Sequence, residues 1–297
     1  MSFLVQYVEE ALTPISHQKE FMKSKIKSIK NALTFCSKIK PKEIHLGGSF
    51  AKGTMLKSHL DADLVFAYND IDEVGKNWNK LTVMVEKTLR DNFHKIDIEP
   101  AGNLAIHLKT RLDNQLVNFD VVPCYYVKQP KNMAKYAADD KLYQGMTTIF
   151  HTRYVERYKN ISYFSHTVRL LKAWKKEHNI PLKSIHLELL AVDVYENILD
   201  DIANPGSLDI ILYECFDNIL QTMEGRTVYP ANWKGFENNN YEEYYDEPVL
   251  IDPGNPDSNM FNGFLTKAKI NTIKLKTEIT MYNLKNKNYA EIFRFYN

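Results

Sequence analysis

The sequence predicts an α/β protein with two lobes, a mixed β-sheet with attached helices in residues 1–150 and a mainly helical lobe in residues 151–297. Short apolar runs that end at turn residues predict strands at 43–46, 61–67, 95–99, 104–110 and 115–122. Apolar residues spaced by three and four predict helices at 16–35, 50–56, 73–93, 161–178, 184–199, 207–223 and 258–283. The polar, acidic segment 237–248 interrupts the helical half and predicts an exposed loop.

Composition excludes several classes of protein. A formal net charge of +1 gives no overall attraction to nucleic acid or to an anionic membrane. Three cysteines lie far apart in the sequence, which argues against a disulfide framework and a zinc site. Glu9 and Glu10 fall where a signal peptide needs an unbroken apolar run, and no run of 18 apolar residues occurs. We therefore expect a cytoplasmic monomer that does not bind membranes.

A glycine-rich turn follows the predicted strand 43–46. Gly47 and Gly48 allow the backbone to approach a ligand closely, and Ser49 stands where a helix begins, so that amide N–H groups face outward. This arrangement suits the phosphates of a nucleoside triphosphate. Nearby side chains that would add positive charge, fix the loop or contact a phosphate oxygen are Lys52, Thr54 and Lys57.

Two aspartates stand on alternate positions of the next predicted strand. Asp61 and Asp63 therefore project from one face, and their carboxylates repel each other unless a cation such as Mg²⁺ or Mn²⁺ lies between them. Asp120, in an apolar strand where a lone charge is costly, is the best candidate for a third ligand. Three carboxylates can hold two metal ions roughly 3.5–4 Å apart, which suits an in-line phosphoryl displacement. The pattern predicts nucleotidyl transfer with pyrophosphate as the leaving group.

Each of these features also has an ordinary structural interpretation. A GGS turn is usually only a turn, two alternate aspartates occur on many surface strands, and Asp120 by itself fits a hydrogen-bonded structural residue. Their order along the chain, on these predicted elements, favours one site. The lysines of the helix at 16–35 are best explained as a solvated helix face, although RNA contact is an alternative.

The motifs resemble those of one enzyme family. GGSFAKGTML at 47–56 and SHLDADLV at 58–65 are similar to segments of the 2′-5′-oligoadenylate synthetases and their bacterial relatives, the cGAS/DncV-like nucleotidyltransferases (CD-NTases), which have the polymerase-β-like fold. His59 and Leu60 depart from the animal synthetases, which place a serine directly before the first aspartate. Further similar segments are FDVVPC at 119–124, RLLKAW at 169–174, IHLELL at 185–190 and LIDPGNPDSN at 250–259.

The resemblance implies roles for individual residues. Asp61, Asp63 and Asp120 would be catalytic and would hold two Mg²⁺ or Mn²⁺ ions. Gly48 and Ser49 would bind the β- and γ-phosphates. The rest of the implied nucleotide-binding set consists of Lys52, Thr54, Lys172, Ser184 and Asp193, with Lys172 as the best candidate for a triphosphate contact and Asp193 near the position that contacts the base.

The implied function is synthesis of a cyclic di- or trinucleotide, or of a short oligonucleotide, from ATP, GTP or other NTPs as a second messenger in bacterial anti-phage signalling. Its effector would bind the product rather than the protein, and a nucleic-acid activator is not expected. The alternatives are an RNA-directed enzyme similar to the CCA-adding enzymes and, as a weaker one, a non-enzymatic nucleotide-binding protein. Base identities, ring size, linkage and any need for activation are open.

Overall fold

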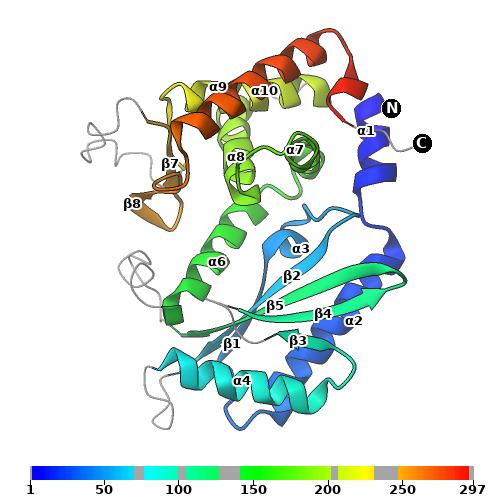
Figure 1. The fold of residues 1–297 in the computed structure, drawn as a ribbon, viewed down its shortest axis with the longest axis vertical. Helices are drawn as coiled ribbons and strands as arrows, with labels where there is room; N and C mark the ends of the chain where they lie inside the picture. The colour runs from blue at the N-terminus through cyan, green and yellow to red at the C-terminus, as the bar shows by residue number, and fades with distance from the viewer. Residues whose placement is uncertain are drawn as a thin grey trace. The chain divides into compact units, whose positions relative to one another are not determined.

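A computed structural model describes residues 2–69, 77–99, 105–126, 141–201, 207–230 and 247–293 (Figure 1). Its contacts divide the chain into two compact units. The sheet unit comprises residues 13–156, and the helical unit comprises residues 1–12 together with 157–297. Residues 1–12 thus fall in the helical unit, although the sequence grouped them with the sheet. The predicted acidic loop lies, at 237–246, outside the described residues.

The sheet unit is built on a five-stranded mixed sheet of order β1-β2-β5-β4-β3. Its strands are β1 (Glu43–Gly47), β2 (Leu60–Tyr68), β3 (Asp97–Glu99), β4 (Ile106–Leu112) and β5 (Gln115–Tyr125). The central pair, β2 and β5, is parallel, and the other neighbours are antiparallel. A hairpin joins β4 to β5, and its turn contains Asp113 with a φ of 53°. The predicted mixed α/β fold is confirmed.

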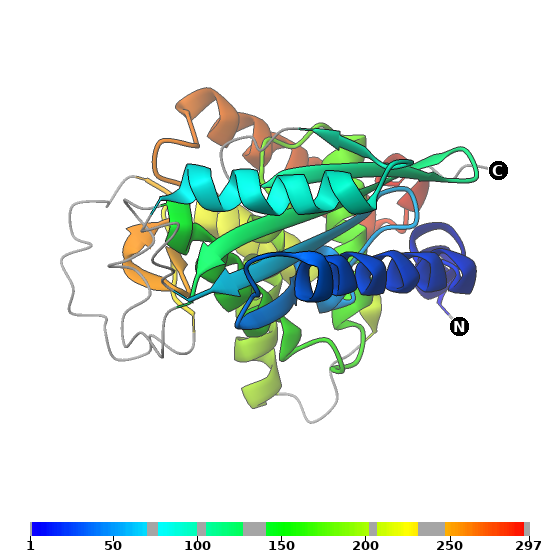
Figure 2. The same ribbon diagram turned by 90° about the horizontal axis from the view of Figure 1, so that it is seen from below.

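One face of this sheet is apolar and carries the core. Alternate residues of β2, among them Leu64 and Phe66, are fully buried there with Phe119 of β5. Helices α2 (Ser16–Asn31) and α4 (Trp78–Asn92) cover this face, as Figure 2 shows. The strand alternation places the other set of β2 side chains, which includes the aspartates, on the opposite face.

The opposite face carries an apolar patch next to the aspartates. Helix α6 (Lys141–Glu156) packs there through Ile149 against Val65, Ala67 and Val122. No helix was predicted at 141–156, and α6 crosses the predicted domain boundary at residue 150. The strand residues that precede this apolar patch carry the polar side chains of the candidate site.

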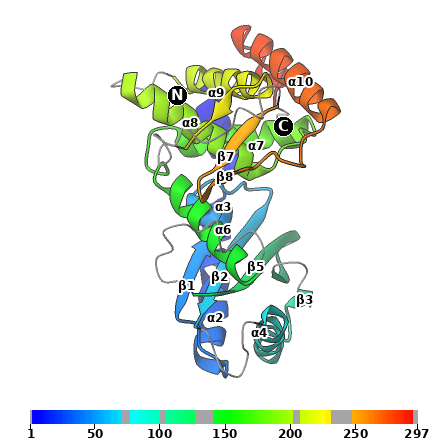
Figure 3. The same cartoon turned by 90° about the vertical axis from the view of Figure 1, so that its left-hand side faces the viewer.

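The helical unit contains α7 (Phe164–Glu177), α8 (Ser184–Asp201), α9 (Leu208–Met223) and α10 (Lys267–Lys285). Helices α9 and α10 lie side by side (Figure 3), and the indole Nε1 of Trp174 in α7 donates to Thr280 Oγ1 in α10 over 2.8 Å. A small sheet accompanies them, with strands β6 (Thr227–Val228), β7 (Val249–Asp252) and β8 (Asn255–Asn259). Strand β8 takes up the first residues of the helix predicted at 258–283, so α10 begins only at Lys267. Among the described helices, none is long and apolar enough to cross a bilayer.

Candidate active site

The three predicted aspartates share one face of the five-stranded sheet. In the parallel pair, Asp63 of β2 stands directly beside Asp120 of β5, and Asp61 stands beside Asn118. On the other side of Asp120, the cross-strand neighbour is His107 of β4. Cross-strand neighbours present their side chains on the same face, and residues two apart on a strand do so as well. The register therefore brings Asp61, Asp63 and Asp120 together, and each is partly exposed.

The glycine-rich turn lies against these aspartates. Helix α3 (Gly48–Lys52) begins directly after β1, so the turn is held beside β2, with which β1 pairs. The Ser49 hydroxyl lies 3.1 Å from Asp61 Oδ1 and donates a hydrogen bond to it. The backbone N–H of Gly48 donates to Thr152 Oγ1 of α6 at 3.3 Å. Ser49 and Asp61 thus form one hydrogen-bonded unit.

Gly48 is needed for steric reasons. Its φ is +66°, a left-handed conformation that other residues adopt at a cost. A Cβ at this position would lie 2.0 Å from Oδ2 and 2.9 Å from Cγ of Asp63, far inside van der Waals contact. The absence of a side chain at residue 48 is what lets the Asp63 carboxylate occupy its place.

Asp120 has a partner that the sequence analysis did not single out. Its Oδ1 lies 2.7 Å from Nδ1 of His107, and the two side chains are 37% and 39% exposed. This contact fixes the orientation of the carboxylate, as hydrogen bonds commonly do for carboxylates that bind metals. The pairing of His107 with Asp120 follows from a two-residue turn at Asp113 and Asn114, one residue shorter than the hairpin loop 112–114 that the sequence predicts.

The donor chemistry fits a hard divalent cation. All three aspartates offer carboxylate oxygens, the ligands that Mg²⁺ and Mn²⁺ prefer. The carboxamide Oδ1 of Asn118, next to Asp61 in the register, is buried and accepts no hydrogen bond. Within the described ranges, no three His, Cys, Asp or Glu side chains are gathered closely enough to hold a metal ion in the present side-chain arrangement. The three aspartates nevertheless fit a divalent cation, because they offer the right ligand atoms and lie at neighbouring positions on one face of the sheet. A bound cation would draw their oxygens together.

Two further predicted residues support the turn. Thr54 is fully buried, and its backbone N–H donates to the Ser49 carbonyl over 3.0 Å. The Lys52 side chain is also buried, with only 7% of the residue exposed. Both residues thus lie inside the structure behind the turn that carries Ser49.

The remaining predicted nucleotide-binding residues lie in the helical unit. Lys172 of α7 is 7% exposed, and its Nζ is ion-paired at 2.6 Å with Oε1 of Glu188 of α8, which is 1% exposed. Burial of both partners makes this pair part of the packing between the two helices. Ser184 is the first residue of α8 and is partly exposed.

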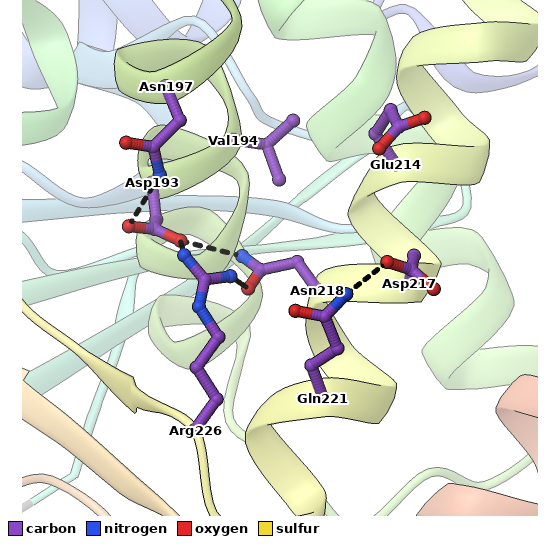
Figure 4. A pocket seen from close by; sticks show the side chains of 8 residues that line it. All are labelled: Asp193, Val194, Asn197, Glu214, Asp217, Asn218, Gln221 and Arg226. Atoms are coloured by element: carbon purple, nitrogen blue, oxygen red, sulfur yellow. Dashed lines mark hydrogen bonds and ion pairs between the residues drawn. The ribbon is translucent and has the colours of Figure 1, made fainter.

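Asp193 lies in a polar pocket of about 420 Å³ between α8 and α9 (Figure 4). Its Oδ2 accepts from Asn218 Nδ2 at 3.1 Å and from Arg226 Nη2 at 3.0 Å, and its Oδ1 accepts from Asn197 Nδ2 at 3.3 Å. Burial raises the pKa of the Asp193 carboxyl above its ordinary value, and the positive charge of Arg226 opposes this rise. These three hydrogen bonds hold the Asp193 carboxylate in place. Glu214, Asp217 and Gln221 also line the pocket.

Comparison with known proteins gives matches over much of the chain. Residues 26–143, which include the turn and all three aspartates, match the nucleotidyltransferase domain family. The 2′-5′-oligoadenylate synthase 2 of Mus musculus is 24% identical over 279 residues, covering 79% of this chain and 36% of the mouse protein. The CCA-adding enzyme of Thermoplasma volcanium is 32% identical over 222 residues, covering 72% of this chain and 41% of that enzyme. The chain thus spans between a third and a half of the length of these two relatives.

Solved structures resemble the chain over nearly its whole length. The structure of Escherichia coli CdnC with ATP has a TM-score of 0.69 at 18% identity, and the match covers 97% of this chain and 92% of the CdnC chain. The CD-NTase CdnG of Bradyrhizobium diazoefficiens in complex with GTP has a TM-score of 0.64 at 13% identity and covers 97% and 91%.

Residues 26–143 thus form a nucleotidyltransferase domain, and the fold is the polymerase-β-like one. Its fold is similar to that of CdnC and of the CD-NTase CdnG, and its sequence relatives include an oligoadenylate synthase. The resemblance that the sequence motifs indicated is confirmed.

Proposed function

We propose that this nucleotidyltransferase joins NTPs into a cyclic di- or trinucleotide, or a short oligonucleotide, that acts as a second messenger in bacterial anti-phage signalling. One observation carries the proposal: within the matched domain, Asp63 stands beside Asp120 in register and Asp61 lies two residues before Asp63 on the same face. Carboxylates at neighbouring positions on one sheet face cost free energy through repulsion unless they serve a cation.

Asp61, Asp63 and Asp120 would hold the divalent ions, Mg²⁺ or Mn²⁺. Bound ions of this kind neutralise charge on the phosphates and polarise the attacking hydroxyl. In the reaction, a ribose hydroxyl of one nucleotide forms a bond to the α-phosphorus of another NTP while the bond to pyrophosphate breaks. Asp120, oriented by His107, would help to remove the hydroxyl proton. Catalysis of this type rests mainly on positioning and charge neutralisation.

Gly48 and Ser49 would bind the β- and γ-phosphates. The hydrogen bond from Ser49 to Asp61 supports this assignment, because it joins the phosphate-binding turn to the first metal-binding carboxylate. Lys172 and Ser184, on α7 and α8, complete the proposed triphosphate contacts. Because Lys172 is already paired with Glu188, the Glu188 carboxylate would weaken the attraction between Lys172 and a phosphate.

ATP and GTP are the proposed substrates, because similar structures hold one or the other. Asp193 would take part in base selection through its pocket. Because its oxygens already accept hydrogen bonds from Asn197, Asn218 and Arg226, we propose that it fixes the Arg226 guanidinium. Nη1 of that group already donates to Asn218 and Nη2 to Asp193, so its remaining N–H groups would be the ones to contact acceptors of a base such as guanine.

A second candidate is transfer of nucleotides to the end of an RNA. The 32% identity to an archaeal CCA-adding enzyme favours it, although the chain covers 41% of that enzyme. The near-zero net charge argues against it, because proteins that grip RNA concentrate basic residues.

The test incubates the purified protein with each radiolabelled NTP, singly and mixed, with Mg²⁺ or Mn²⁺, and separates phosphatase-treated products by chromatography. A phosphatase-resistant product from wild type, absent with Asp61→Ala, is expected. Circular dichroism checks that this variant remains folded. Parallel reactions with tRNA and double-stranded RNA distinguish the second candidate, for which label appears only on added RNA. Asp61→Ala with wild-type turnover would refute the assigned site.

A further inference from the structure

Asn118 carries a buried acceptor that the sheet leaves without a partner. Its Oδ1 is inaccessible to solvent and accepts no hydrogen bond. Asn118 occupies the β5 position directly beside Asp61 and two residues before Asp120, so its side chain projects from the face that bears the aspartates. A buried carbonyl oxygen without a donor costs free energy, and such groups in folded proteins usually mark a missing water, an ion or a catalytic role.

The nearest cross-strand cation does not satisfy this oxygen. Lys109 of β4 is the register neighbour of Asn118 on the side away from Asp61. Its Nζ is instead ion-paired with Oε1 of Glu99 on β3. On its other side, Asn118 faces a carboxylate, and a carboxylate offers no proton to an acceptor. The two register neighbours of Asn118 are thus a carboxylate and a lysine that is ion-paired with another residue.

Carboxylate oxygens beside an unpartnered amide oxygen, with Ser49 donating to one of these carboxylates, form a surrounding that suits a hard divalent cation. Amide oxygens of asparagine are ligands for such ions together with carboxylates. We infer that Asn118 is an additional ligand of the divalent cation site, contributing its carboxamide oxygen beside Asp61. This inference rests on the proposed function, because it presupposes that the aspartates bind a cation.

The inference predicts opposite effects on stability and on metal binding. Asn118→Ala removes an unsatisfied buried acceptor, so the thermal midpoint in EDTA stays unchanged or rises. The same variant loses one ligand, so its affinity for Mn²⁺ falls on the order of tenfold. A residue with only a structural role would show the reverse: lower stability in EDTA and unchanged Mn²⁺ affinity.

A second variant keeps the ligand atom. Asn118→Asp retains an oxygen and adds a charge beside Asp61, so it binds Mn²⁺ at least as tightly as wild type and melts at a lower temperature in EDTA. Asn92→Ala serves as a control, because Asn92 lies at the end of α4 and its Nδ2 donates to the Thr88 carbonyl at 2.8 Å, away from the aspartates. This control leaves Mn²⁺ affinity at the wild-type value.

The experiment measures Mn²⁺ binding by isothermal titration calorimetry and by the loss of the free-ion EPR signal, with thermal melts in EDTA. Wild-type affinity in Asn118→Ala, together with loss of binding in Asp61→Ala, would overturn the inference and leave the proposed function intact. Wild-type binding in both variants would overturn the proposed metal site itself. If Asn118→Ala loses both stability and affinity, Asn118→Asp decides: weak binding by this variant too would assign Asn118 a structural role.

Discussion

Replacing Gly48 with alanine tests the close approach of the turn to Asp63. The new Cβ would lie 2.0 Å from Asp63 Oδ2 and 3.4 Å from the Asp63 backbone nitrogen. The backbone nitrogen is fixed by the sheet, so the carboxylate is the part that moves. Alanine at this position therefore displaces one of the proposed metal ligands without changing its chemical identity.

The cost has two components. A left-handed φ of +66° costs an L-residue about 1–2 kcal/mol. Moving the Asp63 side chain out of a favourable rotamer adds about 0.5–1.5 kcal/mol. We expect Gly48→Ala to lower the free energy of unfolding by about 1.5–3.5 kcal/mol in total. Displacement of a catalytic carboxylate by about 1 Å lowers turnover on the order of 100-fold.

Gly263 provides a matched control. Its φ is +65°, and a Cβ there would meet no atom within 4 Å. Gly263→Ala therefore carries the backbone cost alone, about 1–2 kcal/mol, and keeps its activity. Urea unfolding and NTP turnover are measured for both variants. Equal stability losses in the two variants, or near wild-type turnover in Gly48→Ala, would refute the steric argument.

Three further outcomes are expected. His107→Leu lowers kcat about 10–100-fold with little change in KM for NTP. His107→Asn keeps an N–H donor toward Asp120 and therefore retains most of the activity. Equal losses of kcat in the two variants would contradict a positioning role for His107. Lys172→Met destabilises the protein by about 3–5 kcal/mol in urea unfolding, because it leaves the Glu188 carboxylate buried without its charge partner, and Glu188→Leu added to it recovers most of this loss. The folded Asp193 carboxyl has a raised pKa, so the folded state holds its proton to higher pH than the unfolded state; the free energy of unfolding therefore falls as pH rises from the ordinary carboxyl pKa through the raised one. Asp193→Asn should flatten this fall in urea titrations at a series of pH values.

The sequence was sufficient to predict most of the sheet unit. Strand alternation separated Asp61 and Asp63 from Ala62 and Leu64, and the structure places the two sets on opposite faces. The turn residues 112–114 also predicted the hairpin between β4 and β5, although not its register. These features depend on local chemistry, namely turn residues and a period of two, so a single sequence can reveal them.

Other features depend on contacts between distant segments. Lys172 falls on a helix face with other basic residues, a pattern typical of solvated or phosphate-binding lysines, but it is buried because Glu188 of α8 packs against it. The pairing of Asp63 with Asp120 needs β2 and β5 to be parallel neighbours, and 46 residues separate the end of β2 from the start of β5. Helix propensity alone does not reveal α6 or its packing on one sheet face.

The polar half of that face carries a cost that the rest of the unit must offset. Like charges directly opposite each other on paired strands are destabilising, and Asp63 stands opposite Asp120. Asn118 adds an acceptor without a donor in the same neighbourhood. Folding alone would favour threonine or valine at these positions, as in the adjacent patch under α6, where Val65 and Val122 are paired. Strands β2 and β5 thus carry both the Asp63–Asp120 pair and the Val65–Val122 pair, so the sheet itself does not require aspartates. A ligand that binds the folded state is the simplest source of the compensating free energy.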